Sequence, residues 1–292
     1  MKQYLGFDLG GSSLKVGIVT DTGEVIHHEK HSTPDNFDRL IQLMADIYHT
    51  LKKDYSILGI GISSCGCIDP ETGKIGGWMA PSVLYLIGNC YYDLQKLVDV
   101  PVRAEKDSQA AALGEYWTGD AAQYQSFLTI VLGSGQGGAL FIDGKPFRGA
   151  HFLCGDMGYV SPARDMPGYS AMTAPFPFEK RYEKETGRHL SCSDMYLYRE
   201  SDPVAARLWN EFIKNLAYFC VQMQFTFDTE RIFIGGGISG WKPFIPMLQQ
   251  EIDDFLKEWH CDFNRPIVLA CKAGNDANLL GAVYSLKQKY DI

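Results

Sequence analysis

The first thirty positions alternate between hydrophobic runs and turn residues, which predicts three short strands. Apolar stretches over 4–8, 14–20 and 24–31 are separated by Gly10-Gly11-Ser12-Ser13 and by Asp21-Thr22-Gly23. Such short connections favour antiparallel pairing, so the chain is expected to open with an antiparallel three-stranded unit.

Helical periodicity begins at Asn36, a residue type that often caps helices. The apolar positions that follow recur at helical spacing and share one face, at Phe37, Leu40, Ile41, Met44, Ile47, Tyr48 and Leu51. Beyond them the pattern predicts strands over 58–63 and 102–105, a helix that includes 94–98, and an alanine-rich helix over 110–117.

The opening pattern returns in the second half of the chain. YLGFDLGGSSLKVGIVTDTGEVI and FLTIVLGSGQGGALFIDGKPF each contain a hydrophobic strand, a glycine-rich hairpin, a second strand and a turn into a third. Strand and helix segments follow each copy, which predicts a duplicated α/β domain with a cleft between its halves. We assign residues 1–115 and the final helix 276–292 to a first lobe, and residues 116–275 to a second.

The least regular region is 161–203, which contains five prolines. It is expected to be an insertion that carries one short helix. After it, periodicity predicts a long amphipathic helix over 208–223, a strand over 231–234, a helix over 244–259, a strand over 266–271, and a last helix from Asp276 that packs on the first lobe.

Composition excludes several classes of protein. With 292 residues, 46% of them hydrophobic, the chain can bury a core and is neither disordered nor fibrous. A net charge of −8 without any basic run argues against nucleic-acid binding. The sequence has no membrane-spanning apolar stretch, no signal-peptide pattern, and eight cysteines without a CxxC pair. We therefore expect a cytoplasmic protein with reduced thiols and no membrane partner.

Asp8 stands at the end of the first predicted strand, directly before the glycine-rich hairpin. Glycines let backbone N–H groups approach a phosphate, and Ser12 and Ser13 add hydroxyl donors. A carboxylate at this strand end can hold the waters of a phosphate-bound Mg²⁺. The same residues are also compatible with an ordinary hairpin that has an aspartate in its turn.

Two further glycine clusters end strands in the second half. Gly133-Ser134-Gly135 repeats the first hairpin, and Gly235-Gly236-Gly237 leaves room for an adenine ring or a ribose against the backbone. Each cluster alone is equally compatible with a tight turn. The order of the three clusters along the chain is what favours a site for nucleotide phosphates.

Asp107 follows the strand over 102–105 and begins the alanine-rich helix. A carboxylate in this position can be a simple helix cap, because the helix dipole favours negative charge there. If the strand end opens into the cleft, the same carboxylate can take the proton of a substrate hydroxyl that attacks a γ-phosphate.

Together these segments resemble the ROK family (repressors, open reading frames, kinases) of the actin-like sugar-kinase and heat-shock ATPase superfamily. Its motifs are D-x-G-G-T, N-D-x-x-A-A-x-x-E, G-T-G-x-G-G, G-E-x-G-H and I-G-G-G. The matching segments here are Asp8–Ser12, Lys106–Glu115, Gly133–Gly138, Gly155–Tyr159 and Ile234–Gly237. The resemblance covers essentially the whole chain and implies two actin-like (ribonuclease H-like) α/β lobes with a nucleotide and sugar cleft between them.

The resemblance also implies roles for individual residues and a homodimer formed through the second lobe. Asp107 would be the catalytic base for transfer from ATP, and Asp8 would hold Mg²⁺ through water. The implied ATP-binding residues are Asp8, Gly10, Gly11, Ser12, Ser13, Lys15, Gly133, Ser134, Gly135, Gly235, Gly236 and Gly237. The implied sugar-binding residues are Gly66, Lys106, Asp107, Asp156 and Tyr159.

The chain departs from the family pattern at three positions. The usual Asn before the base is Lys106, and the Glu and His of G-E-x-G-H are Asp156 and Tyr159. The family's zinc loop falls at 162–170, which contains neither cysteine nor histidine, so no zinc site is expected. A tyrosine at 159 beside a zinc-free loop is similar to the β-glucoside kinase branch of the family.

The expected function is therefore phosphorylation of a sugar hydroxyl, the 6-OH of a hexose or β-glucoside. Because the chain begins at the first strand, without the helix-turn-helix of the repressor members, it resembles the stand-alone kinases. The alternative is a regulator or sensor that binds sugar and ATP and has weak or no kinase activity, since the three departures surround the implied sugar site.

Overall fold

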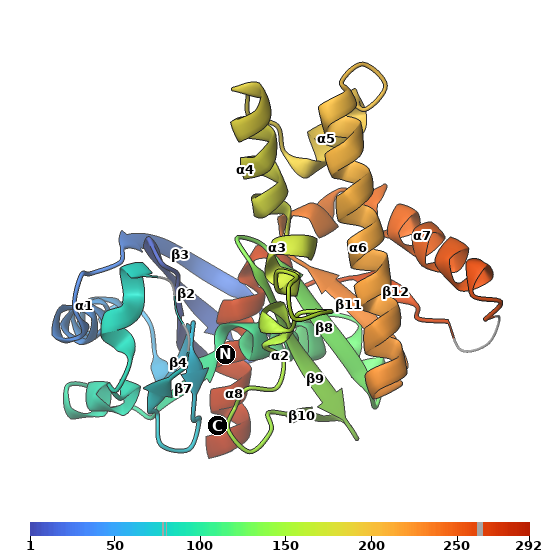
Figure 1. Ribbon diagram of the computed structural model, residues 1–292. Coiled ribbons are helices and arrows are strands. Elements are labelled where there is room, and N and C mark those ends of the chain that lie inside the picture. The colour runs from blue at the N-terminus through green and yellow to red at the C-terminus, as the bar shows by residue number, and fades with distance from the viewer. Residues whose placement is uncertain (78, 80, 262–264) are drawn as a thin grey trace. The chain divides into compact units, whose positions relative to one another are not determined.

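The computed structural model describes residues 1–292 except 78, 80 and 262–264 (Figure 1). The chain divides into two compact units. Unit 1 comprises Met1–Ala122, Arg148–Leu153 and Asn275–Ile292, and unit 2 comprises Gln123–Phe147 and Cys154–Gly274. This division differs from a boundary at 115 because helix α2 continues beyond that residue and stays with unit 1 as a whole.

Unit 1 is built on a five-stranded sheet in the order β3-β2-β1-β4-β7. β3, β2 and β1 pair antiparallel, whereas β1, β4 and β7 pair parallel. Two short strands, β5 (Cys67–Ile68) and β6 (Ile75–Gly76), form a separate hairpin. The strands of the main sheet are β1 (Gln3–Leu9), β2 (Ser13–Thr20), β3 (Val25–Ser32), β4 (Ile57–Ser64) and β7 (Val102–Lys106). The predicted antiparallel opening is confirmed.

Helix α1 (Phe37–Leu51) packs its apolar stripe against one face of this sheet, together with side chains such as Phe7 and Ile62. Asn36 caps the helix, as predicted, because its side chain accepts a hydrogen bond from the backbone N of Arg39 at 2.9 Å. The helix predicted around 94–98 is a short 3₁₀ helix, η2 (Tyr91–Lys96), and a similar one, η1 (Pro81–Leu86), precedes it.

Helix α8 (Ala277–Tyr290) covers the opposite face, over a row of glycines. Gly6 pairs with Gly17 on one side and with Gly61 on the other. A Cβ on Gly61 would lie 2.5 Å from the backbone of Ala282, and one on Gly6 would lie 3.3 Å from Leu279. The last helix therefore approaches the strands almost to backbone contact, which side chains in this row would prevent.

Helix α2 (Asp107–Thr118) packs against α8 just as closely. A Cβ on Gly281 would overlap the carbonyl of Ala110, and one on Gly114 would overlap the carbonyl of Ala277. Since α2 begins at Asp107, this contact holds the candidate base at the end of β7.

Unit 2 repeats the sheet of unit 1 in the order β10-β9-β8-β11-β12. Its first three strands again pair antiparallel and its last two extend the sheet in parallel. The strands are β8 (Phe127–Leu132), β9 (Gln136–Ile142), β10 (Lys145–Phe147), β11 (Arg231–Gly235) and β12 (Val268–Ala270). The internal sequence similarity thus corresponds to one topology used twice.

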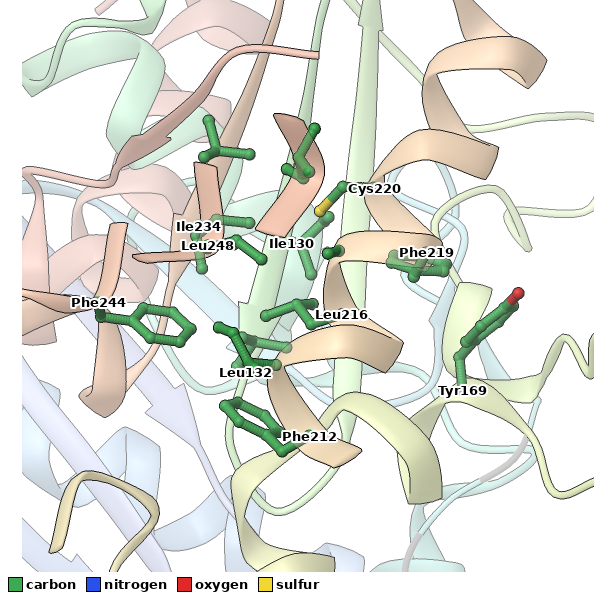
Figure 2. Close-up of a cluster of buried hydrophobic side chains, with 14 of the residues drawn as sticks. Ile130, Leu132, Tyr169, Phe212, Leu216, Phe219, Cys220, Ile234, Phe244 and Leu248 are labelled. Carbon is green, nitrogen blue, oxygen red and sulfur yellow. The ribbon is translucent and has the colours of Figure 1, made fainter. Parts of the chain in front are cut away.

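Helices α6 (Pro203–Phe227) and α7 (Phe244–Glu258) contribute to the core of unit 2 (Figure 2). Asp202 caps α6 by accepting from the backbone N of Val204 and Ala205. The buried cluster in Figure 2 combines side chains from β8, β11, α3, α6 and α7: Ile130, Leu132, Ile234, Tyr169, Phe212, Leu216, Phe219, Cys220, Phe244 and Leu248.

The prediction of one short helix in 161–203 is wrong. This region contains α3 (Tyr169–Thr173), α4 (Pro175–Thr186) and α5 (Cys192–Tyr198), after a 3₁₀ helix η4 (Met157–Tyr159). Pro175 and Pro203 begin helices instead of interrupting them, because the first helical turn needs no backbone N–H donor. The remaining 3₁₀ helices are η3 (Ala121–Gln123), η5 (Gly237–Gly240) and η6 (Gly274–Asp276).

Among the described helices, none combines the length and the apolar character required to cross a membrane.

Gly281→Ala is expected to destabilise the protein, because the added Cβ would overlap the carbonyl of Ala110. Overpacking of this kind costs about 1–3 kcal/mol in the free energy of unfolding. Gly240→Ala is the matched control, since a Cβ there meets no atom within 4 Å. Urea unfolding curves that coincide for the two variants would contradict the close packing of α2 and α8.

Candidate functional site

The candidate site of unit 1 lies at the carboxyl ends of three adjacent parallel strands. Pairing places Asp8 of β1 beside Ser63 of β4, and Ser63 beside Glu105 of β7. These three residues share the α8 face of the sheet, one row beyond the glycines, and Asp107 follows directly after β7. The carboxyl ends of such strands are where α/β sheets bind ligands.

Asp8 is 7% exposed, and its carboxylate accepts three hydrogen bonds. Lys15 Nζ and Ser63 Oγ each donate at 3.2 Å, and Asn278 Nδ2, at the start of α8, donates at 2.8 Å. An ionised carboxylate has about four acceptor positions, so one remains for a water molecule. The arrangement therefore fits a hydrated Mg²⁺ held through water, and Lys15, predicted as an ATP residue, pairs with Asp8.

The hairpin between β1 and β2 is open to solvent at its tip. Gly10 N donates to Ser13 O at 2.9 Å and closes the turn, and Thr33 Oγ1 donates to Gly10 O at 2.8 Å. Gly11 and Ser12 are exposed. A turn held in this way presents backbone N–H groups and a hydroxyl without a large rearrangement, which suits phosphate oxygens.

Asp107 is half-buried at the N-terminus of α2, and its Oδ1 accepts from the backbone N of Ser108 at 2.6 Å. The charge of this carboxylate affects the pKa of Cys65, which lies in the loop after β4. Burial first, and then the charges of Asp107 and Asp8, raise the pKa of its thiol to about 11. Unit 1 therefore brings Asp8, Cys65 and Asp107 together.

Gly66, directly after Cys65, has a φ of 99°, and a side chain there would overlap Met79, so the turn requires glycine.

The charged residues at the two ends of the family-like segment 106–115 are also buried. Lys106, directly before the base, is 5% exposed at the end of β7. Glu115 is fully buried, and its Oε1 accepts from the backbone N of Asp120 at 3.0 Å, beyond the end of α2. Glu115 thus stabilises the fold, whereas Lys106 lies where it can influence the site.

A buried ion pair adjoins the strand that leads to the base. Glu105 is 1% exposed, and Arg148 donates to it from Nη2 at 2.6 Å and from Nε at 3.3 Å. Ser285 Oγ of α8 donates to the same carboxylate at 3.1 Å. The segment 148–153 is in this way fixed to β7. Sequence reasoning missed this pair, although an acidic residue inside an apolar strand was the available signal.

Unit 2 contains a pocket of about 420 Å³, within the usual range of ligand-binding pockets. It lies at the end of β8 and is lined by residues of η5, α4 and the start of α5. The lining residues are Leu132, Gly133, Ser134, Pro175, Phe176, Glu179, Ser191, Cys192, Ser193, Gly237, Ile238 and Trp241. Three of the residues predicted to bind ATP therefore share one cavity.

The glycines around this pocket have different roles. Gly236 has a φ of 94°, and a Cβ there would overlap the carbonyl of Leu132, so the packing of β11 beside β8 requires glycine. At Gly133 and Gly237 a Cβ would meet no atom within 4 Å. The fold does not need glycine at these two positions, both of which line the pocket. Gly135 and Gly235 lie in packed surroundings. A Cβ on Gly135 would lie 3.2 Å from Ser170 Oγ, and one on Gly235 would lie 3.3 Å from Cys271 Sγ.

Asp156 and Tyr159 lie at the two ends of the η4 segment in unit 2. A side chain on Gly155 or Gly158 would overlap the backbone of β9, so this segment is held tightly against the strand. Asp156 is half-buried, and Tyr159 is 66% exposed. The segment therefore presents the tyrosine ring at the surface of unit 2.

Metal-binding side chains are not clustered in the described residues: no three or more His, Cys, Asp or Glu are arranged to hold an ion there. His27 and His31 of β3 instead hydrogen-bond to the Glu29 carboxylate between them, at 2.9 and 2.8 Å.

Comparison with known proteins gives a consistent result. The model of the ROK family matches residues 4–289. A β-glucoside kinase from Klebsiella pneumoniae is 32% identical over 297 residues, which cover 97% of this chain and 96% of that protein. A ROK family protein from Streptococcus pneumoniae, solved in complex with sucrose, has a TM-score of 0.88 at 25% identity and covers 99% of both chains.

A more distant structure shares the fold. The ROK family glucokinase from Streptomyces griseus, in complex with glucose and AMPPNP, has a TM-score of 0.77 at 21% identity, over 96% of this chain and 97% of its own. These similarities confirm the predicted fold class, an α/β protein of the actin-like type.

Gly237→Leu is expected to weaken ATP binding by about tenfold or more, because the side chain would fill space in the pocket that the fold leaves open. Gly240→Leu, on the same 3₁₀ helix but outside the pocket, is the control. Isothermal titration with ATP measures the difference. Equal affinities in the two variants, both folded by circular dichroism, would remove Gly237 from the nucleotide site.

Proposed function

This chain belongs to the ROK family and is an ATP-dependent sugar kinase, and we propose that its acceptor is the 6-hydroxyl of a β-glucoside. Asp107 is proposed as the general base, and Asp8 as the residue that holds Mg²⁺ through water. The main support is the position of the two carboxylates at the ends of β1 and β7, with β4 between them.

The spacing of these strands supports the assignment. Neighbouring strands lie about 4.8 Å apart, so the ends of β1 and β7 are separated by about 10 Å. That distance leaves room for a phosphoryl group and the attacking hydroxyl between Asp8 and Asp107. Ser63 and Asn278 hold the Asp8 carboxylate in place from β4 and α8.

Each group has a defined part in the proposed reaction. Asp107 accepts the hydroxyl proton as the sugar oxygen attacks the γ-phosphorus, the bond from that phosphorus to the β,γ-bridging oxygen breaks, and ADP leaves. The backbone N of Ser108 orients the Asp107 carboxylate. The Gly10–Ser13 turn donates backbone N–H and hydroxyl groups to the phosphates. Mg²⁺, when bound, would neutralise part of the phosphate charge.

The pocket of unit 2 is proposed to bind the adenosine part of ATP. Phe176, Ile238 and Trp241 provide the apolar and aromatic surface that a flat base needs. Gly133 and Ser134 line the same cavity from the end of β8, where they suit the phosphate side of the nucleotide. Phe176 is therefore assigned to the nucleotide.

A β-glucoside is favoured as the acceptor by two of the three departures from the family pattern. Lys106 is a buried ammonium directly before the base, and Tyr159 presents an exposed ring that can stack on a second sugar or an aglycone. The relative with 32% identity is a β-glucoside kinase. The retained Asp107 and glycine clusters favour catalysis over a sensor without activity.

A coupled ADP-release assay tests the function directly. Glucose, fructose, mannose, N-acetyl sugars, cellobiose and arbutin are compared as acceptors, and cellobiose or arbutin is expected to have the highest kcat/KM. Binding of sugar and ATP without turnover of any acceptor would instead identify a sensor.

Asp107→Asn is expected to lower kcat by about 10²–10⁴-fold while the protein stays folded and binds ATP, because an amide cannot accept the hydroxyl proton. Asp38→Asn, on the exposed side of α1, is the control for the chemical change. A kcat of Asp107→Asn within threefold of the wild type would show that another group is the base.

The double variant Lys106→Asn with Tyr159→His restores the family's usual residues. We expect it to change the ratio of kcat/KM between cellobiose and glucose by about tenfold or more, since polar contacts of this kind contribute about 1–3 kcal/mol. The two single variants show which residue is responsible. An unchanged ratio in all three would show that other side chains determine acceptor choice.

A further inference from the structure

Glu179 is the only carboxylate among the described residues that line the unit 2 pocket. It lies on α4, three and four positions after Phe176 and Pro175, and so shares one side of that helix with them. Helix α4 belongs to the region that the sequence predicts as largely irregular, and Glu179 is not among the predicted nucleotide residues.

One oxygen of Glu179 is anchored to the protein. Its Oε1 accepts from the backbone N of Cys192, the first residue of α5, at 3.2 Å. Ser191 is held separately, since its hydroxyl donates to Asp194 at 2.7 Å and accepts from the backbone N of the same residue. Within the described residues Glu179 Oε2 makes no hydrogen bond, so the carboxylate is fixed by one oxygen and has the other available for a ligand.

The charge of Glu179 restricts how a nucleotide can lie in the pocket. A triphosphate and a carboxylate repel each other, and the repulsion is stronger away from bulk water. The phosphates should therefore lie beside Gly133 and Ser134, and the nucleoside beside Glu179. A carboxylate only accepts hydrogen bonds, so its partner must be a donor of the nucleoside.

We propose that Glu179 binds the ribose hydroxyls and makes this kinase select ribonucleotides over deoxyribonucleotides. The ribose carries two neighbouring O–H donors, whereas the faces of the base are matched by Phe176, Ile238 and Trp241. The inference rests on the proposed ATP pocket and adds to it a residue that sets nucleotide specificity.

The test compares ATP, 2′-deoxy-ATP, 3′-deoxy-ATP and ITP as phosphoryl donors for the wild type and Glu179→Ala. Wild-type kcat/KM is expected to be about 10- to 100-fold higher for ATP than for at least one deoxy nucleotide. This is the size of effect that one hydrogen bond to a charged group contributes to binding. In Glu179→Ala the kcat/KM values for ATP and the deoxy nucleotides should differ by no more than about threefold, because only the value for ATP falls. Dissociation constants from titration calorimetry should show the same change without relying on turnover.

Two further variants act as controls. Glu183→Ala lies one turn later on α4, where Glu183 pairs with Lys180 outside the pocket, and it should keep the wild-type preference. Glu179→Gln retains an acceptor oxygen without the charge, so its preference should lie between those of the wild type and Glu179→Ala.

Wild-type protein that uses ATP and both deoxy nucleotides equally well would overturn the inference. It would equally fail if Glu179→Ala kept the preference for ATP over the deoxy nucleotides and lost only the discrimination against ITP, because Glu179 would then contact the base. Failure of the proposed function looks different: the wild type would phosphorylate no sugar, while its binding constants would still show whether ribose is selected.

Discussion

The contact between α8 and the glycine row of the first sheet is the constraint on which the unit 1 site depends. Gly6 and Gly61 let the helix lie against the strands, and Gly281 lets α2 lie against the helix. The N-terminal end of α8 then supplies Asn278 to Asp8, and α2 holds Asp107 at the end of β7. A larger side chain in this row would separate the helix from the strands and loosen both carboxylates.

The two units build different candidate sites on one sheet topology. In unit 1 the strand ends carry carboxylates, which suit the proton transfer and Mg²⁺ binding that we propose. In unit 2 the corresponding strand ends carry Gly133 and Gly236, and the pocket beside them is walled by helices α4 and α5. A nucleoside needs apolar surface and a few fixed polar atoms, which strand ends alone do not provide. The region 161–203 supplies this wall, and its prolines begin helices that bring Phe176 and Glu179 to the pocket.

Outside 161–203, local sequence pattern was sufficient for the order of the main strands and helices, for the cap at Asn36, and for Asp8 and Asp107 as candidate site residues. Each of these is determined by neighbours within a few positions: a period of apolar residues, a polar residue before a helix, a carboxylate at the end of a strand. The repeated hairpin was visible for the same reason, since both copies keep their own turn residues. The helices of 161–203 were missed because a proline that starts a helix and one that interrupts it look alike in sequence.

Tertiary structure alone decided which distant residues complete the site. Asn278 is 270 positions from the Asp8 carboxylate that it holds, and Arg148 is 43 positions from Glu105, so neither pair leaves a local pattern. The glycines show the same division. The sequence identified Gly236 and Gly237 as one cluster. Only the packing shows that Gly236 is required by the neighbouring β8, whereas Gly237 borders the pocket. The physical reason is that hydrophobic periodicity and turn residues act between neighbours along the chain. How closely two backbones approach depends instead on which distant segments the tertiary structure places side by side.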